Sequence, residues 1–541
     1  MSATTPQPPP AIGGGASYTS ASVPHAAFHP RASAWLIAVV VTLAPFMEVL
    51  DTTIVNVSLP HIAGSLSASY DDATWALTSY LVANGIVVPI SGWFGRLLGR
   101  KQYFLLCIAM FTLCSFMCGV ATSLSQLVVF RLMQGFFGGG LQPNQQSIIL
   151  DTFEPSQRGR AFSIVAFGII FAPVLGPTLG GWLTDTWSWR WVFLINVPMG
   201  VLAFLTVAQL VEDPPWVKGD RARLIDVDYV GLSLIAIGFG ALQIMLDRGE
   251  DNDWFSSPVI RLAGLVAAAS LLGAVCWLLL SEKPIVDLRA LGDRNFAVGS
   301  VMVFGIGLSL YSSLVLIPLL AQAWLGYTAL LTGLALSPGA ALMIVLIPLV
   351  ARLVLPNVST RVVIAFGFLC LGGASLYAAR LAPDVDFSWL AWIRAYQTIG
   401  LGFLFVPNST MAYATLPRER NADATALYSM FRNIAGSTGI SIATAITANR
   451  LQVHRAYLAT HLSPLDQPYN NLLAQYHHAL QALGYAGGAA TNAAMGLING
   501  TLNQQAAILA YGDVFTLTAV ASFAVVPLAF LFRPGIAGRR H

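Results

Sequence analysis

Two carboxylates stand in an apolar stretch near the start of the chain, FMEVLDTTIVNVSLP over residues 46–60, in which Glu48 and Asp51 carry the only charges. Residues three apart share a helix face, so the two carboxylates are expected about one turn apart. A carboxylate at membrane depth costs roughly 2.5–3.5 kcal/mol on insertion scales and is by default a functional candidate. Because burial favours the neutral acid and a nearby cation favours the carboxylate, such a site can exchange protons. We predict proton coupling at both residues; the alternative is a static ion pair or, for Asp51, a helix cap.

The cation for this site is predicted from depth. Asp51 is expected about 12 Å below the outer end of its span, and Arg131 about 8 Å below the outer end of another. An unpaired buried arginine costs several kcal/mol, so Arg131 needs an anion or several carbonyl groups. The sequence therefore places Arg131 at a depth where it can meet Asp51.

Two further arginines fall inside apolar segments. Arg394 has no carboxylate within the spans of its own half of the chain, so it holds Gln397, backbone carbonyls or an anionic substrate, with a structural role favoured. Arg432 is expected close to mid-membrane, where it binds an anionic group or pairs with Glu48. Polar side chains inside the spans are candidates for the substrate cavity: Asn56, Gln134, Asn144, Arg394, Gln397, Asn408 and Arg432.

The elements that position these residues are transmembrane helices. The 541 residues are 56% apolar and 10% charged, and the mean hydropathy is +0.68, values that exclude an ordinary soluble domain. Helices are expected because a bilayer leaves open strand edges unsatisfied. About fourteen segments are long enough to cross a bilayer. They are residues 33–59, 72–95, 102–122, 126–150, 159–184, 190–211, 228–246, 258–280, 296–323, 329–351, 361–380, 389–415, 424–447 and 510–532.

An internal repeat divides the spans into two halves. RLMQGFFGGGLQPN from Arg131 matches RAYQTIGLGFLFVPN from Arg394, and each is followed by a basic loop. A repeat that keeps its orientation suggests two bundles related by an axis along the membrane normal. The predicted fold is all-α, with two six-helix bundles and two inserted helices. The predicted domains are a disordered extension (1–32), an N-terminal bundle (33–212), an inserted linker (213–293), a C-terminal bundle (294–533) and a tail (534–541).

Lys and Arg concentrate in the loops that alternate spans place on one side, which predicts that both termini are cytoplasmic. The long outer stretch at residues 448–509 has the pattern of one or two amphipathic helices, either a cap on the bundle or a docking surface for another subunit. A run of small and kinking residues in the fifth span suits a close, mobile helix contact, or a static packing face. Its members are Pro173, Gly176, Pro177, Gly180 and Gly181.

Four motifs in order give the chain a family resemblance. LDTTIVNVSLP, GWFGRLLGRK, RLMQGFFGG and APVLGPTLGG resemble those of the major facilitator superfamily, in particular its fourteen-span drug:proton antiporters and, most closely, the EmrB-type pump subunits. The resemblance implies a multi-pass protein of the bacterial inner membrane that exports hydrophobic or amphipathic compounds in exchange for protons. It also implies Asp51 as the leading proton carrier, Arg131 as its modulator, and Gly176, Pro177, Gly180 and Gly181 as a gate. The implied partners are membrane lipid, a membrane-fusion adaptor and an outer-membrane channel.

The sequence contains no phosphate-binding Gly-Lys-Ser/Thr loop, metal constellation or Ser/His/Asp arrangement. We therefore expect no enzyme activity, no cofactor or metal and no nucleic-acid partner, with the proton gradient as energy source. A stand-alone exporter of one metabolite, such as a fatty acid, siderophore or aromatic acid, is the alternative. A membrane sensor would need a soluble signalling domain, and the sequence shows none. An intramembrane enzyme would have only Glu48 with Asp51 as an acid pair.

One position departs from the superfamily pattern. The loop motif usually has Asp where this chain has Arg96, and usually has Arg where it has Leu97. The charge lock made by that Asp cannot form in its usual way, so Arg96 is assigned no gating role.

Overall fold

The computed structural model describes residues 30–533 apart from 69, 155, 215–227, 251, 283, 383–384, 418–419 and 464. All secondary structure of this part is helical, as predicted. Most of the predicted N-terminal extension, the predicted C-terminal tail and part of the inserted linker lie outside the described residues.

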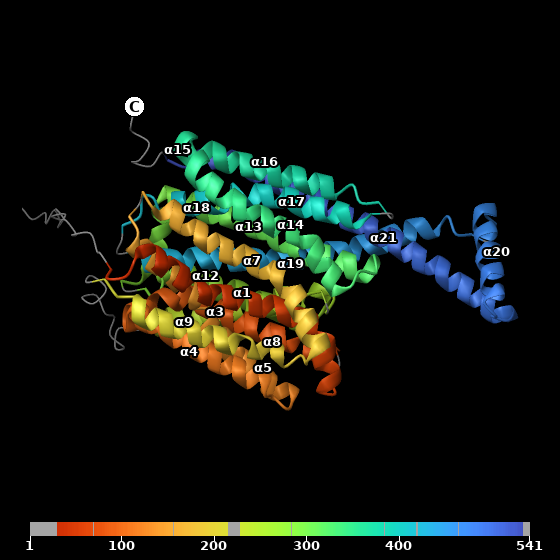
Figure 1. The fold of residues 1–541 in the computed structure, drawn as a ribbon, viewed down its shortest axis with the longest axis horizontal. Coiled ribbons are helices and arrows are strands. Elements are labelled where there is room, and N and C mark those ends of the chain that lie inside the picture. Colours follow the sequence, from red (N-terminus) through yellow and green to blue (C-terminus); the bar gives the residue numbers. More distant parts are fainter. Residues whose placement is uncertain are drawn as a thin grey trace, which may run out of the picture.

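The N-terminal half is a bundle whose first helix, α1, carries both Glu48 and Asp51 (Figure 1). Its helices are α1 (Ala34–Ser65), α2 (Tyr70–Ala73), α3 (Trp75–Leu98), α4 (Arg100–Gly119), α5 (Leu124–Gly138), α6 (Leu141–Thr152), α7 (Arg158–Thr186), α8 (Trp191–Leu194) and α9 (Asn196–Leu210).

The C-terminal half is a second bundle, and its two longest helices extend beyond it. Its elements are α13 (Arg294–Leu319), η4 (Leu320–Trp324), α14 (Ala329–Leu349), η5 (Val350–Val354), α15 (Leu355–Asn357), α16 (Thr360–Ala378), α17 (Phe387–Gly402), α18 (Phe405–Ala412), α19 (Asn421–Ala459), α20 (Gln467–Ala482), α21 (Gly487–Val525) and η7 (Val526–Leu531).

Two predicted spans are broken helices. The span at 126–150 consists of α5 and α6, and the span at 389–415 consists of α17 and α18, so each half has a break after its matching arginine. Ten helices of the described chain are long and apolar enough to cross a membrane on their own. With the two broken spans and the helices α7 and α19 included, the arrangement is consistent with fourteen crossings.

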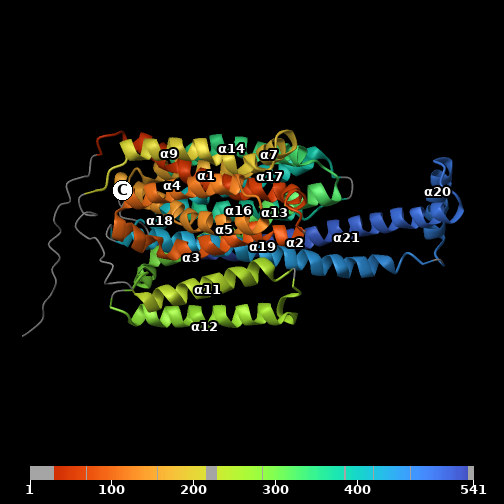
Figure 2. The ribbon, with the colours of Figure 1, turned by 90° about the horizontal axis from the view of Figure 1, so that it is seen from below.

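The halves meet along two contact regions, one where α3 and α6 pack against α19 and one where α14 and α18 pack against α7. The inserted helices lie along the contact of α3 with α19 (Figure 2). They are α11 (Tyr229–Arg248) and α12 (Pro258–Leu280), with the short η2 (Trp254–Ser256) and η3 (Leu288–Gly292). α11 packs against α3 and α19, and α12 packs against α11. The outer face of α12 exposes leucines such as Leu265 and Leu272, which suits contact with lipid chains.

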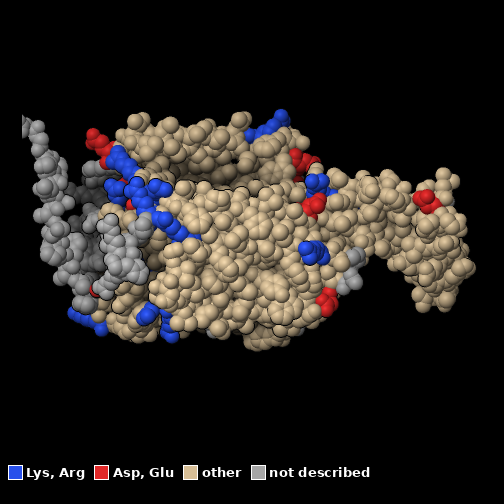
Figure 3. Space-filling view, turned by 90° about the horizontal axis from the view of Figure 1, so that it is seen from above, with Lys and Arg blue, Asp and Glu red and all other residues tan. Residues whose placement is uncertain are grey.

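Basic side chains gather at one end of the molecule. The start of α1 and the end of η7 lie at that same end, opposite α20 (Figure 1). In Figure 3 Lys and Arg are clustered there, and the other end carries a sparser mixture of both signs. The predicted cytoplasmic position of both termini depends on this distribution, because Lys and Arg concentrate on the cytoplasmic side of membrane proteins.

The outer stretch differs from the prediction. It is not a loop with the spans ending at 447 and beginning again at 510, because α19 continues to Ala459 and α21 begins at Gly487. Side chains join the two helices at the outer end of the bundle: His454 Nε2 lies 2.9 Å from Asp513 Oδ2, and Arg455 Nε donates to Asn503 Oδ1 at 2.8 Å. The predicted amphipathic helix is present as α20, which projects far beyond the bundle (Figure 1).

Glycines bring α5 close to α3. A Cβ added at Gly135 would lie 2.2 Å from the carbonyl oxygen of Tyr80, and one at Gly139 would lie 2.8 Å from that of Asn84. Such small residues are what allows membrane helices to approach closely without a hydrophobic driving force between them. This close contact fixes the face of α5 that carries Arg131.

Gly135→Ala is therefore expected to lower the free energy of unfolding by about 1–3 kcal/mol, the usual cost of overpacking. The matched control is Gly373→Ala in α16, where an added Cβ meets nothing within 4 Å. There the change is expected to stabilise the helix by about 0.5–1 kcal/mol. Thermal unfolding in detergent measures both, and equal effects of the two changes would contradict the packing argument.

Candidate functional site: a buried carboxylate and arginine network

The predicted pairing of Asp51 with Arg131 is confirmed. Arg131 Nη1 on α5 lies 2.5 Å from Asp51 Oδ2 on α1, and both side chains are fully buried. The same nitrogen donates to Gln134 Oε1 at 2.9 Å, and Nε donates to the carbonyl oxygen of Ala76 at 2.9 Å. The guanidinium also stands 4.3 Å from the ring centre of Tyr80, so the cation is enclosed by a carboxylate, carbonyls and an aromatic face.

The other carboxylate oxygen of Asp51 is held by amides. Oδ1 accepts from Gln134 Nε2 at 3.2 Å and from Asn196 Nδ2 at 2.7 Å. Asn196, at the start of α9, also donates to Ser115 Oγ at 3.0 Å. Sequence reasoning predicted Gln134 as a cavity residue and missed Asn196, whose only signal is an isolated amide in the apolar stretch LINVPMG.

Glu48 belongs to a separate cluster where the halves meet. Its Oε1 accepts from Asn84 Nδ2 of α3 at 3.0 Å, and its Oε2 has no hydrogen-bond partner among the described residues. Arg432 of α19 donates to Gln142, a neighbour of Glu48. The proposed direct pairing of Arg432 with Glu48 is not formed among the described ion pairs, so the carboxylate and this guanidinium face each other through amides.

Arg394 is buried without a counterion. Its Nη1 lies 3.5 Å from Gln397 Oε1, and its Nε has no hydrogen-bond partner among the described residues. Gln397 Oε1 also accepts from Ser313 Oγ at 2.6 Å. No ion pair of Arg394 occurs within the described part of the chain. Arg131 of the first half has a carboxylate counterion, whereas Arg394, its match in the second half, has none there.

Three of the predicted cavity residues lie away from these clusters. Asn144 Nδ2 donates to the carbonyl oxygen of Arg100 at 2.8 Å, and Asn408 Nδ2 donates to that of Gly299 at 3.0 Å. Both side chains are buried and join helices of their own half. Asn56 lies on an exposed part of α1, more than one helical turn away from Asp51 along the chain.

The small residues of α7 face α1 within the same half. A Cβ added at Gly176 would lie 2.2 Å from Thr53 Oγ1, and one at Gly180 would lie 3.0 Å from the carbonyl oxygen of Ile54. Gly181 is buried in the same helix. The side chains of Pro173 and Pro177 lie outside those described. The helix that holds Asp51 and Glu48 thus packs on α7, which in turn borders α14 of the other half.

Arg96 makes a contact that the sequence did not predict. Arg96 of α3 forms an ion pair with Asp423 of α19, and its Nη2 donates to the carbonyl oxygen of Ile285 at 3.3 Å. Close by, Arg100 pairs with Asp151 within the first half. The usual acid of the motif is replaced by a base, and the partner half supplies the acid. The sequence reasoning assigned Arg96 no gating role and did not foresee this pair, in which opposite charges of reversed polarity join the halves.

Comparison with known proteins places the chain in a family. The sequence profile of the Major Facilitator Superfamily matches residues 41–440. The fatty acid resistance protein FarB of Neisseria gonorrhoeae is 35% identical, over 91% of this chain and 94% of its own length. The multidrug export protein EmrB of Escherichia coli K12 is also 35% identical, over 92% and 95%.

Solved structures agree on the fold. An auto-inhibited peptide transporter of the POT family has a TM-score of 0.57 at 16% identity, over 94% of this chain and 98% of that one. The human organic anion transporter MFSD10 has a TM-score of 0.54 at 13% identity, over 91% and 100%. At such identities the similarity concerns the fold alone.

The sequence matches, the two-bundle helical architecture and the buried carboxylate and arginine pair lead to one conclusion: this multi-pass membrane protein is a transporter, not an enzyme, and it belongs to the EmrB-type branch of the major facilitator superfamily.

Proposed function

We propose that the protein is a proton-driven antiporter that exports hydrophobic and amphipathic toxic compounds across the inner membrane of a bacterium. The observation that carries this proposal is the buried pair of Asp51 and Arg131, with Asn196 and Gln134 on the second carboxylate oxygen. The proton gradient supplies the energy, and no bound cofactor takes part.

The pair is suited to couple proton binding to a conformational change. Proton uptake by Asp51 removes the counterion of Arg131, and breaking a buried ion pair costs about 3–5 kcal/mol. The arginine must then find another partner or water, so the protonated protein favours a different arrangement of α1 and α5. Release of the proton on the other side restores the pair, and each cycle moves one site between two states.

The substrate class is proposed from the relatives. Their names describe multidrug export and resistance to fatty acids, and these relatives align over nearly the whole chain. We therefore propose drug efflux by proton antiport.

A second candidate is an exporter specialised for anionic amphiphiles such as fatty acids. The buried, unneutralised Arg394 favours it, because a carboxylate head group would supply the missing counterion. A general exporter of hydrophobic compounds would show no preference for an anionic substrate.

Both proposals are tested with purified protein in proteoliposomes that carry an imposed pH gradient and an internal pH dye. Substrate addition is expected to dissipate part of the gradient. A fatty acid and a lipophilic cation of similar size then separate the candidates, after subtraction of the proton movement that the fatty acid causes in empty vesicles. No response to any substrate would contradict proton antiport.

We further propose that the outer helices dock a membrane-fusion adaptor, which hands substrate to an outer-membrane channel. α20 projects from the bundle, and no residue of this helix is buried in the described structure. Replacing residues 467–482 by a short Gly/Ser linker is expected to abolish co-purification with the adaptor and to leave proton exchange in proteoliposomes unchanged. Retention of the complex by this variant would count against the docking role.

A further inference from the structure

The segment that returns from the inserted helices to the second bundle crosses the junction of the two halves. We call residues 284–287, which lie between α12 and η3, the strap. The strap has no helical structure, yet Ile285 and Val286 are only 1% and 2% exposed. Connecting segments normally run over the surface, where water satisfies their backbone groups. A buried connection therefore needs specific partners.

Those partners come from three parts of the chain. Arg96 of α3 donates from Nη2 to the carbonyl oxygen of Ile285 at 3.3 Å. The amide of Ile285 donates to Oδ2 of Asp228, the residue before α11, at 3.4 Å. Asp287 Oδ2 lies 3.8 Å from Nε of Arg420, the residue before α19. The strap is thus bonded to the first half, to the inserted pair and to the second half.

Burial of apolar side chains holds the strap more than charge does. Ile285 and Val286 belong to one buried apolar cluster that also contains Ile90 of α3 and Leu427 of α19, one from each half. Removal of such surface from water is the dominant favourable term in packing. The ion pair with Arg420 is partly exposed, so it contributes little to stability and mainly fixes the position of the strap.

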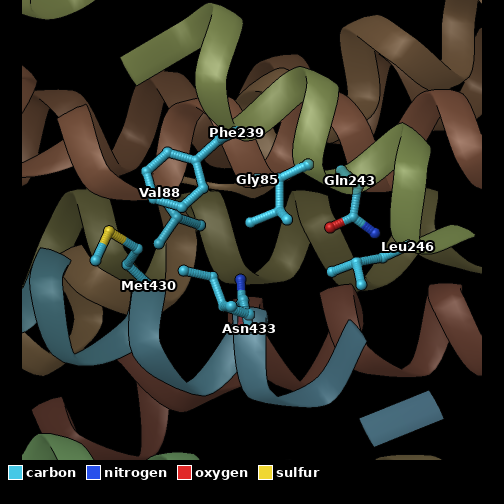
Figure 4. A pocket seen from close by; sticks show the side chains of 9 residues that line it. Gly85, Val88, Phe239, Gln243, Leu246, Met430 and Asn433 are labelled. Atoms are coloured by element: carbon cyan, nitrogen blue, oxygen red, sulfur yellow. The ribbon is translucent and has the colours of Figure 1, made fainter. Parts of the chain in front are cut away.

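The inserted pair fixes where the strap can lie. Farther along the junction, α11 packs against both α3 and α19. Side chains from the three helices line one small hollow there (Figure 4), and they include Val88, Phe239, Gln243, Met430 and Asn433. The pair is therefore held by both halves, and it presents the strap at the end of the molecule where Lys and Arg gather, which we call the basic end.

We propose that the strap is a latch that keeps the two halves closed at the basic end. Opening this end separates α3 from the start of α19, and a segment bonded to both cannot follow both. The strap must then leave its seat and expose Ile285 and Val286. Release of the return segment thus becomes a condition for opening. This proposal rests on the proposed export function, in which the halves open and close, and adds a regulatory device to it.

Loosening the strap is expected to shift the protein toward the state that is open at the basic end. Ile285→Ala with Val286→Ala removes apolar surface that is buried in the closed state. Distances between spin labels at the exposed Glu154 and Asn357, one on each half, report the open fraction without substrate or pH gradient. The ratio of open to closed molecules is expected to rise about tenfold, which corresponds to roughly 1.4 kcal/mol.

Leu279→Ala with Leu280→Ala, at the end of α12, is the matched control. These neighbouring leucines are 51% and 82% exposed, so the same kind of truncation removes little buried surface and should leave the ratio unchanged. Val286→Ala alone is a milder change if the double variant impairs folding, which thermal unfolding reports. An unchanged ratio in folded strap variants, or an equal rise in the control, would overturn the proposal.

The coupling between the strap and the halves must be reciprocal. Asp423→Asn weakens the ion pair that joins the halves and leaves the hydrogen-bond partners of Ile285 in place. Hydrogen exchange of the strap amides is therefore expected to accelerate in proportion to the rise in the open fraction, while the amides of α12 keep their rates. A strap that stays protected while the halves open would contradict the latch.

Neither measurement uses substrate or a gradient, so both are independent of proton antiport. Failure of all substrates to move protons would remove the proposed function and leave the result on the latch standing. Normal proton exchange together with an unchanged open fraction in the strap variants would remove the latch alone.

Discussion

Asp51→Asn is expected to reduce substrate-driven proton exchange to the level of empty vesicles. Asparagine keeps the shape of the side chain and can still accept a hydrogen bond from Asn196, but it does not titrate at any accessible pH. The exchange measured in proteoliposomes would therefore lose its proton carrier. Asp513→Asn, which removes a half-exposed acid of the outer helices, is the matched control and should retain exchange.

Stability must be separated from coupling in this experiment. Removing one partner of a buried ion pair costs about 3–5 kcal/mol, so Asp51→Asn is expected to lower the melting temperature by leaving Arg131 unpaired. The double variant Asp51→Asn with Arg131→Gln removes both charges and should recover most of the stability while staying uncoupled. Proton exchange that survives in a folded Asp51 variant would assign the coupling elsewhere, with Glu48 as the next candidate.

Reversing the charge of Arg96 is expected to open the end of the molecule where basic residues gather. Arg96→Asp places two acids against each other across α3 and α19, in place of the pair of Arg96 with Asp423. A hydrogen bond between charged groups contributes about 1.5–3 kcal/mol, and partial exposure lowers this to about 1–2 kcal/mol. The closed state should thus lose roughly 5- to 30-fold in population.

The exchanged pair provides the decisive control. Arg96→Asp with Asp423→Arg restores opposite charges and should restore both closure and transport, whereas each single reversal impairs them. Distances between spin labels at Glu154 and Asn357, one on each half, measure closure directly. Equal behaviour of the single and double variants would show that the contact is incidental.

The site was partly predictable because placing charged side chains inside a membrane costs much free energy. Charged side chains at membrane depth are few, so Asp51 and Arg131 could be paired from their expected depths alone, and the repeat marked Arg394 as the second arginine. Asn196 escaped prediction because a single amide in an apolar helix costs little and has no periodic pattern. The break between α5 and α6 also escaped, since glycines in membrane helices are common and do not by themselves end a helix.

The contact of Arg96 with Asp423 shows the limit of motif reasoning. The motif showed that the usual acid is absent, and the expectation that its charge lock cannot form in the usual way considered only one half of the chain. Asp423 lies 327 residues away, at the start of α19, where an acid in the first turn of a helix has an ordinary explanation. Complementarity between distant segments was not visible in local sequence.

The outer helices turn small rotations into large displacements. α19 has 39 residues, about 58 Å at 1.5 Å per residue, and its inner part belongs to the C-terminal bundle, which we propose tilts during transport. A rigid arm of that length amplifies a tilt of a few degrees into several ångströms at α20. An adaptor bound at α20 would therefore be displaced in each transport cycle. A fluorophore attached at the exposed Leu483 would report this displacement in real time.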